Sequence, residues 1–252
     1  MNKTVFLVVL LLCALSGTCG SPAFGGDISL SITTSITVDR NANSPDGNRA
    51  NVKVAITNKG DETASNLSLQ ARLSGLTRTV AVAGQAAPGK TVDVAFTMPV
   101  PATLNGSYPV PITVSYAHPN GQAEAVVLIA ALQTTDGGHG SPLAMKLELR
   151  QRGGADFLAA SVSTNDPALK EITLTCHLPA GLTVEQNQRR LRLDNGTAAT
   201  TFDLAAARGV QGRYAVYVVA EADVNGRHEM AATAIAVPIA PQNHDVSPCA
   251  VM

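Results

Sequence analysis

Apolar and polar residues alternate with a period of two from about residue 28 onwards. The apolar members of the four clearest runs are Ile28, Leu30, Ile32, Ile36 and Val38; Val52, Val54 and Ile56; Leu67, Leu69, Ala71 and Leu73; and Val92, Val94, Phe96 and Met98. Successive side chains of a β-strand point to opposite faces, so this period predicts strands with one buried and one polar face. Turn-forming segments such as NKGDE and APGK separate the runs, and no long amphipathic helix is visible. The sequence predicts an all-β protein.

The second half of the chain repeats the pattern of the first. NLSLQARLSGLT, from Asn66, aligns with EITLTCHLPAGLT, from Glu171, and GSYPVPITVSYAHPNGQAE, from Gly106, aligns with GRYAVYVVAEADVNGRHE, from Gly212. The offset is about 105 to 107 positions, which is the size of one β-sandwich domain. We therefore expect one sandwich over residues 26–133 and a second over residues 143–238.

Polar segments flank the second copy. TTDGGHGSP, within the predicted linker 134–142, is polar and rich in glycine, which suits a hinge on the surface. The last residues, 239–252, are predicted to form a flexible C-terminal tail.

Both copies carry the pattern G-x-Y before their last hairpin, at Gly106 and Tyr108 and again at Gly212 and Tyr214. In immunoglobulin-like sandwiches, a Tyr at the start of strand F bonds back to the backbone of the corner between strands E and F. Each hairpin then turns on an Asn-Gly pair, the strongest signal for a type I′ turn. These features predict two tandem immunoglobulin-like (fibronectin III-like) β-sandwiches, in which the two Tyr and two Gly residues have structural roles.

The first copy resembles a known group of domains. VKVAITNKGDETASNLSLQARL, GQAAPGKTVDVAFTMPVP and GSYPVPITVSY follow one another along the chain. They give a strand ending in Asn-x-Gly, a Pro-Gly-x-Ser/Thr turn into an alternating strand, and a strand F that begins with Tyr. This order resembles bacterial secreted immunoglobulin-like modules of the CARDB and NEW3 type, and the second copy resembles them more loosely. The resemblance implies a non-catalytic module.

The N-terminus predicts export. MNK is followed by the apolar run VFLVVLLLCAL and then by small residues, which is the layout of a signal peptide, predicted over residues 1–25. The apolar run is too short for a comfortable membrane span. We therefore expect a periplasmic, cell-surface or extracellular protein. Lipidation of Cys19 is the alternative to simple cleavage, although Ser16-Gly17-Thr18 matches poorly the residues that usually precede a lipid-bearing cysteine.

Composition narrows the choice of partners. The net charge is −1 and only 15% of residues are charged, which gives no electrostatic footprint for nucleic acid. Trp is absent and aromatic residues make up 4% of the chain, which weighs against sugar stacking, although Tyr116 and Tyr217 remain candidates. Outside the leader, Cys176 and Cys249 are too few for a disulfide framework. Cys176 aligns with Ala71 on an inward face and is predicted to be a buried thiol.

GQAAPGKT, residues 84–91, matches the phosphate-binding loop pattern G-x-x-x-x-G-K-[ST]. A true phosphate loop follows a buried strand and opens a helix, whose N-terminal amides hold the phosphates. Here the following residues alternate as a strand, and the second copy has Asn195-Gly196-Thr197 at the matching position. We interpret the segment as a turn that enters a strand, and we expect no bound nucleotide or other cofactor.

DRNANSPDGN, within the first predicted loop, is rich in oxygen ligands. Asp39, Asn41, Asn43 and Asp46 are candidate calcium ligands, but the glycine and glutamate of an EF-hand loop are missing. A polar loop that joins the first two strands is the favoured alternative.

Two other features suggest sites. The five histidines, which make no close ligand pair in sequence, are His118, His139, His177, His228 and His244. Cys249-Ala250-Val251-Met252 reads as a prenylation box, but prenyl transfer is cytosolic and conflicts with the signal peptide. Neither feature predicts a metal or lipid site.

No nucleophile with its base and no pair of carboxylates can be picked out, so we expect no enzymatic activity. The leading hypothesis is a non-catalytic exported protein that acts as a structural or protein-interaction module. Its surface would be a strand edge or the loops at residues 39–48, 118–122 and 223–227. One alternative is a periplasmic two-domain assembly chaperone, although the basic pair that would hold a subunit's carboxylate is not identifiable. The other is an accessory, polysaccharide-associated module of a secreted enzyme system.

Overall fold

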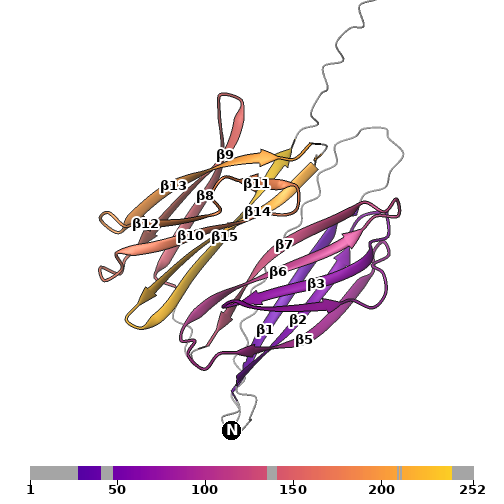
Figure 1. Cartoon of the computed structure of the whole chain (residues 1–252), viewed down its shortest axis with the longest axis horizontal. Helices are drawn as coiled ribbons and strands as arrows, with labels where there is room; N and C mark the ends of the chain where they lie inside the picture. Colours follow the sequence, from indigo (N-terminus) through magenta and orange to yellow (C-terminus); the bar gives the residue numbers. More distant parts are fainter. Residues whose placement is uncertain (1–27, 41–47, 135–140, 209, 211, 240–252) are drawn as a thin grey trace, which may run out of the picture.

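The computed structural model describes residues 28–40, 48–134, 141–208, 210 and 212–239 (Figure 1). Those residues form strands and no helix, and none of them could cross a membrane as a helix. The strands of the first half are β1 (Leu30–Asp39), β2 (Asn48–Asn58), β3 (Ser65–Leu73), β4 (Leu76–Ala81), β5 (Thr91–Val100), β6 (Ser107–Ala117) and β7 (Ala123–Gln133). Those of the second half are β8 (Leu143–Arg152), β9 (Ala155–Thr164), β10 (Glu171–His177), β11 (Leu182–Val184), β12 (Gln188–Arg192), β13 (Thr197–Ala206), β14 (Gly212–Val224) and β15 (Arg227–Ile239).

The strands form four antiparallel sheets that pair into two sandwiches, which confirms the predicted fold class. Sandwich 1 packs the sheet β1-β2-β5 on the sheet β4-β3-β6-β7. Sandwich 2 packs β11-β13-β9-β8 on β12-β10-β14-β15. The order of the strands is the same in both, apart from β11, and it is that of an immunoglobulin-like sandwich. The exact domain boundaries stay a prediction.

The period-two pattern accounts for the core of sandwich 1. Along β3 the residues Leu67, Leu69, Ala71 and Leu73 are all buried, while the residues between them are more exposed. Strands β2 and β5 alternate in the same way, and their buried residues belong to the same cluster. Sandwich 2 has a second cluster, in which Phe202 and Leu174 are fully buried. Each sandwich therefore has its own core between its two sheets.

The two sandwiches also pack against each other, sheet to sheet. Figure 1 shows β14 and β15 of sandwich 2 next to β6 and β7 of sandwich 1, and β15 contacts β6 while β14 contacts β7. On β14, Val216 and Val218 point into the core of sandwich 2, whereas Tyr217 and Val219 belong to the buried cluster of sandwich 1. Met230 and Ile129 join them from β15 and β7. The linker was predicted to be a hinge; most of it lies outside the described residues, but the faces that it connects are buried against each other.

Candidate functional site

The free edge of β5 is the longest strand edge that the described residues leave open. β5 has ten residues and pairs with β2 without a break in register from Thr91 to Val100. Among the described residues, no strand pairs with its other edge. Pro99 stands opposite Arg49 and has no N–H, so this pair is a non-hydrogen-bonded one. The odd-numbered residues of β5 therefore direct their backbone N–H and C=O groups away from β2.

Side chains at these odd positions are exposed and mostly small. They are Thr91, Asp93, Ala95, Thr97 and Pro99. Only Asp93 is charged, and the uninterrupted register shows no β-bulge. The edge therefore offers backbone donors and acceptors to solvent over the stretch from Thr91 to Thr97, with no large side chain in the way.

The other edges in the described part of the chain are protected. β1 lies beside β7, and β8 lies beside β15. β4 has six residues and carries Arg78, and β12 carries Arg189, Arg190 and Arg192. The equivalent of β5 in sandwich 2 is β13, and β11 pairs with its last three residues, which leaves a shorter open edge at Thr197–Asp203 in the described residues. Charged, short or covered edges are how natural sheets avoid pairing with other chains. β5 has almost none of these features.

A buried asparagine fixes the start of this edge. Asn58, at the end of β2, is fully buried. Its Nδ2 donates to the carbonyls of Glu62 (2.6 Å) and Ala86 (2.8 Å), and its Oδ1 accepts from the N–H of Gly60 (3.0 Å). Its backbone exchanges hydrogen bonds with residues 89 and 90, immediately before β5. Every polar atom of the side chain thus contributes to holding three segments together, and the turn before β5 is one of them.

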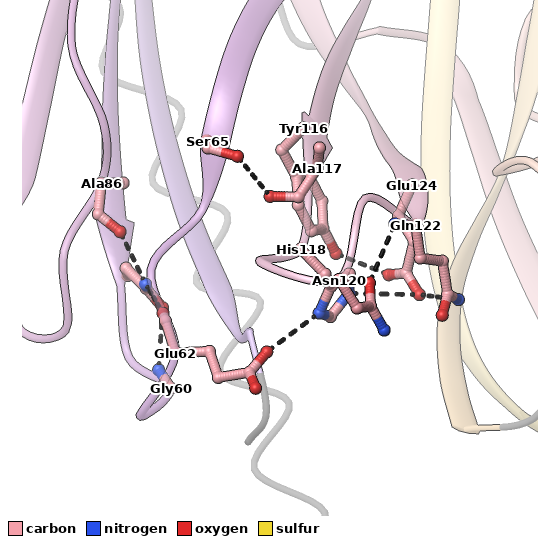
Figure 2. Close-up of polar contacts among 11 residues, drawn as sticks. Gly60, Glu62, Ser65, Ala86, Tyr116, Ala117, His118, Asn120, Gln122 and Glu124 are labelled. Carbon is pink, nitrogen blue, oxygen red and sulfur yellow. Dashed lines mark hydrogen bonds and ion pairs between the residues drawn. The ribbon is translucent and has the colours of Figure 1, made fainter. Parts of the chain in front are cut away.

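One end of sandwich 1 holds a cluster of polar side chains (Figure 2). The ring of His118 lies between two carboxylates, with Nδ1 3.3 Å from Glu62 and Nε2 3.5 Å from Glu124. The hydroxyl of Tyr116 donates to the other oxygen of Glu124 (2.8 Å), and Gln122 donates to Glu124 as well (3.2 Å). The cluster ties the β6–β7 hairpin to the loop before β3.

The corner between β5 and β6 contacts sandwich 2. The ring of Tyr108 stacks on that of His228, with centroids 4.4 Å apart and an angle of 6° between the planes. The backbone N–H of His228 donates to Asn105 O (2.7 Å), and Nδ2 of Asn105 donates to Gly226 O (2.8 Å). Gly106 has a φ of +120°, and a Cβ there would lie 2.0 Å from the carbonyl oxygen of His228. We call this contact the interdomain joint, formed by Asn105, Gly106, Tyr108, Gly226 and His228.

The structural residues predicted from G-x-Y differ in their surroundings. The hydroxyl of Tyr108 accepts from the N–H of Asn105 (3.1 Å), which belongs to the corner between β5 and β6. Gly212 has almost the same φ as Gly106, +121°, but a Cβ there would approach only the ring of Tyr214, at 4.0 Å. Burial and the nearby charge of Glu124 raise the pKa of Tyr214. Within the same motif, Gly106 is therefore packed against the other sandwich, whereas Gly212 is not.

Two hollows lie outside these contacts. A cavity of about 200 Å³ between the sandwiches is lined by Ser107, Gln133, Tyr217, Glu229 and Met230, among others. A shallower hollow of about 710 Å³ lies on sandwich 2, over β8, β9 and β13, and no aromatic side chain lines it.

The two tyrosines considered for sugar stacking are both buried. Tyr116 is 5% exposed and Tyr217 is 3% exposed, so neither of the two tyrosines considered for it offers a ring face to solvent.

The lookalike phosphate loop runs into a strand. Gly84 and Gly89 both have positive φ, at +96° and +71°, and Thr91 begins β5. No helix follows to direct amides at a phosphate, and the interpretation as a turn is confirmed by this geometry.

Of the predicted calcium ligands, Asp39 ends β1 and is exposed, whereas Asn41, Asn43 and Asp46 lie outside the described residues. Within the described ranges, no cluster of three His, Cys, Asp or Glu side chains is placed to hold a metal.

One cysteine, Cys176, lies in the core, and the others lie outside the described residues. Cys176 is a buried free thiol, as its alignment with Ala71 predicted, and burial raises its pKa to about 12. Cys19 and Cys249 lie outside the described residues, as do the predicted leader and residues 240–252 of the predicted tail, whose first residue, Ile239, ends β15.

Sequence reasoning missed the docked face of sandwich 2. Residues 216–220 of β14 are buried without interruption, so both faces of the strand are covered. The signal was present in the sequence YAVYVVA, where apolar residues occupy both parities. The sequence analysis also listed the loop at residues 223–227 among the candidate binding surfaces, whereas Gly226 of this loop lies in the interdomain joint.

Comparisons with known proteins do not assign the chain to a family. No known protein-family profile matches it, and no curated protein sequence matches it. Among solved structures, the crystal structure of red sea bream transglutaminase matches with 14% identity and a TM-score of 0.27. The match covers 82% of this chain and 31% of that one, so this chain spans less than a third of that protein's length. At this identity and TM-score, the likeness says nothing about what the chain does.

Proposed function

We propose that the protein is an exported, non-catalytic binding module that accepts an extended segment of a partner protein along the free edge of β5. In this mode the partner adds a strand to the sheet β1-β2-β5. Main-chain hydrogen bonds supply the affinity, and alternate side chains supply the specificity.

The observation that carries the proposal is the unprotected edge of β5. The edge is ten residues long, pairs with β2 without a β-bulge and carries one charged side chain. The other strand edges of the described residues are shorter, carry charges or lie beside another strand. A long open edge exposes a protein to aggregation and is normally blunted. A function that uses the edge explains why this one is left open.

The chemistry of β5 indicates the kind of segment that fits. Ala95 and Thr97 leave room for side chains of the partner on the solvent face. Asp93 favours a Lys or Arg directly opposite, because cross-strand pairs of opposite charge stabilise a sheet. The segment would lack proline at the positions facing Ala95, where its own N–H must donate.

Two sequence features support the location and the class. The apolar leader of residues 1–25 supports export to the periplasm, the cell surface or the medium. The resemblance of the first copy to modules of the CARDB and NEW3 type supports a non-catalytic role. We place the partner in the cell envelope or in a secreted complex on the same grounds.

The test is crosslinking and pull-down from the native host, followed by binding measurements with the recovered partner. Ala95→Pro removes one backbone donor at the middle of the free edge, where proline is tolerated because that N–H faces solvent. Ala95→Lys places a charge at the same point. We expect each change to weaken binding by about tenfold or more, since each removes or blocks strand pairing.

Ser161→Lys is the matched control, because Ser161 is exposed on β9, a central strand of sandwich 2 with both edges paired. It should leave the affinity unchanged. Equal binding by wild type and both Ala95 variants, with thermal unfolding unchanged, would refute the proposed use of this edge.

A further inference from the structure

The interdomain joint places one histidine between two acidic side chains and an aromatic ring. Nδ1 of His228 lies 2.9 Å from Asp223, and Nε2 lies 3.1 Å from Glu221, both on β14. The ring face is covered by Tyr108 of sandwich 1 at 4.4 Å. The side chain of His228 is 17% exposed. One ring is therefore held by sandwich 2 at its edges and by sandwich 1 at its face.

This geometry requires a particular protonation state. A carboxylate only accepts hydrogen bonds, and a neutral imidazole has one N–H. If His228 were neutral, one ring nitrogen would direct its lone pair at a carboxylate. Both contacts are satisfied only by the imidazolium, which donates from both nitrogens. The positive ring is also attracted to the electron-rich face of Tyr108.

We infer that His228 acts as a pH-sensitive fastener between the two sandwiches, holding the interdomain joint closed as the imidazolium and loosening it when the ring loses its proton. On deprotonation the ring gives up one carboxylate and its cationic attraction to Tyr108. The backbone N–H of His228, which donates to Asn105, sits on the same residue and becomes less protected.

The charges around the ring agree with this assignment. Burial by itself lowers the pKa of His228, but the hydrogen bonds and negative charges of Glu221 and Asp223 outweigh it, so the pKa lies above the ordinary 6.5. Arg227 and Glu229 flank the histidine on β15 and pair with each other at 3.5 Å. From sandwich 1, the neighbouring Asn105 and Gly106 carry no charge, and the phenol of Tyr108 is the titratable group.

One cation of sandwich 1 is connected to the joint through Thr134. Arg40 donates to the carbonyl of Thr134, and Thr134 exchanges hydrogen bonds with Gly106. The sign of the effect follows from the pKa of His228. The stabilisation is complete below pH 6.5 and is lost as the pH rises through the raised pKa of the folded protein.

The test is amide hydrogen exchange on the whole protein between pH 5.5 and 8.5, corrected for the intrinsic rate at each pH, together with an NMR titration of the His228 ring. We expect the protection of the His228 amide to fall about tenfold or more as the ring titrates. The amide of Val218, in the middle of β14, should change far less. A protection profile with a midpoint different from that of the His228 ring would overturn the inference.

Variants separate this role from a merely structural one. His228→Gln should remove the pH dependence and leave the joint in its loose state at every pH. Asp223→Asn should shift the midpoint to lower pH, because one of the two carboxylates loses its charge. His118→Gln is the matched control, since His118 also lies between two carboxylates but follows the end of β6, whereas Tyr108 of the joint lies at its start. Persistence of the full pH dependence in His228→Gln would refute the inference.

Discussion

Sandwich 1 and sandwich 2 have the same strand order, apart from β11, but they differ in which strand edges are unpaired. In sandwich 1 the outer edge of β5 is unpaired in the described residues, and in sandwich 2 the corresponding strand, β13, is paired with β11 at Leu204 to Ala206. In addition, the guanidinium of Arg189 lies over the ring of Phe202 on β13, 5.6 Å from its centroid. The same strand order is therefore compatible with a fully open edge in one sandwich and a partly paired edge in the other. The core between the sheets is built from side chains, so it does not depend on whether that edge is paired.

The corners between the fifth and sixth strands of each copy differ in the same way. Gly106 and Gly212 occupy the same motif with nearly equal φ, but only Gly106 is packed against the other sandwich. Both copies therefore need a residue that adopts a positive φ at this position. In sandwich 1 the residue must also have no side chain, because sandwich 2 packs against it. Substitutions at matched positions can measure the added part directly.

The largest difference is expected between Gly106→Ala and Gly212→Ala. Both place a Cβ at a φ that L-residues avoid, at a cost of about 1–3 kcal/mol in each case. At Gly106 the new Cβ also overlaps the carbonyl oxygen of His228, so the joint must open or shift, at a further cost of roughly 1–3 kcal/mol. Urea unfolding of the two variants measures the difference. Equal losses would show that the interdomain joint contributes nothing to stability.

A smaller total loss of stability is expected for Asn58→Ala and Thr164→Ala, at the ends of the matching strands β2 and β9. Asn58→Ala removes three hydrogen bonds to the backbone, one buried and two part-buried, so we expect a loss of about 3 kcal/mol in the free energy of unfolding. Thr164 accepts one hydrogen bond, from the N–H of Asp166 at 3.1 Å, so its removal should cost about 1 kcal/mol. Thermal or urea unfolding gives both values, and a reversed order would contradict this account of Asn58.

The smallest effect is expected from the two histidines of sandwich 2, whose pKa shifts have opposite signs. Burial lowers the pKa of His177, so its contribution to stability is complete above its ordinary pKa and is lost as the pH falls. His228 behaves in the opposite way, because its pKa is raised. His177→Gln should flatten the acid side of the stability profile, and His228→Gln should flatten the alkaline side. Urea midpoints measured from pH 5 to 9 would reveal the two slopes.

The fold could be predicted from sequence because its signals are local. Alternation along residues such as Leu67, Leu69 and Leu73 gives strands with one buried face. Asn225-Gly226 has the positive φ at both residues that a type I′ turn requires, whereas in the first hairpin only Gly121 does, so the type I′ prediction for Asn120-Gly121 is wrong. β11 could not be predicted, since a strand of three residues carries no period.

The candidate site was less predictable for two physical reasons. Whether an edge such as β5 is free depends on which strands fail to pair with it, and that is a property of the topology. The joint depends on His228 meeting Tyr108 from the other copy, and nothing in either local sequence specifies that contact.

The short strand β11 also affects how many partner strands one molecule could bind. A chain with two open edges on opposite sandwiches could propagate a sheet from molecule to molecule, as heterologous contacts do when they do not close. With β11 laid along the end of β13, only β5 remains open over its whole length within the described residues. Under the proposed mode, β11 therefore shortens the open edge of sandwich 2 to Thr197–Asp203, which disfavours growth of a sheet from molecule to molecule.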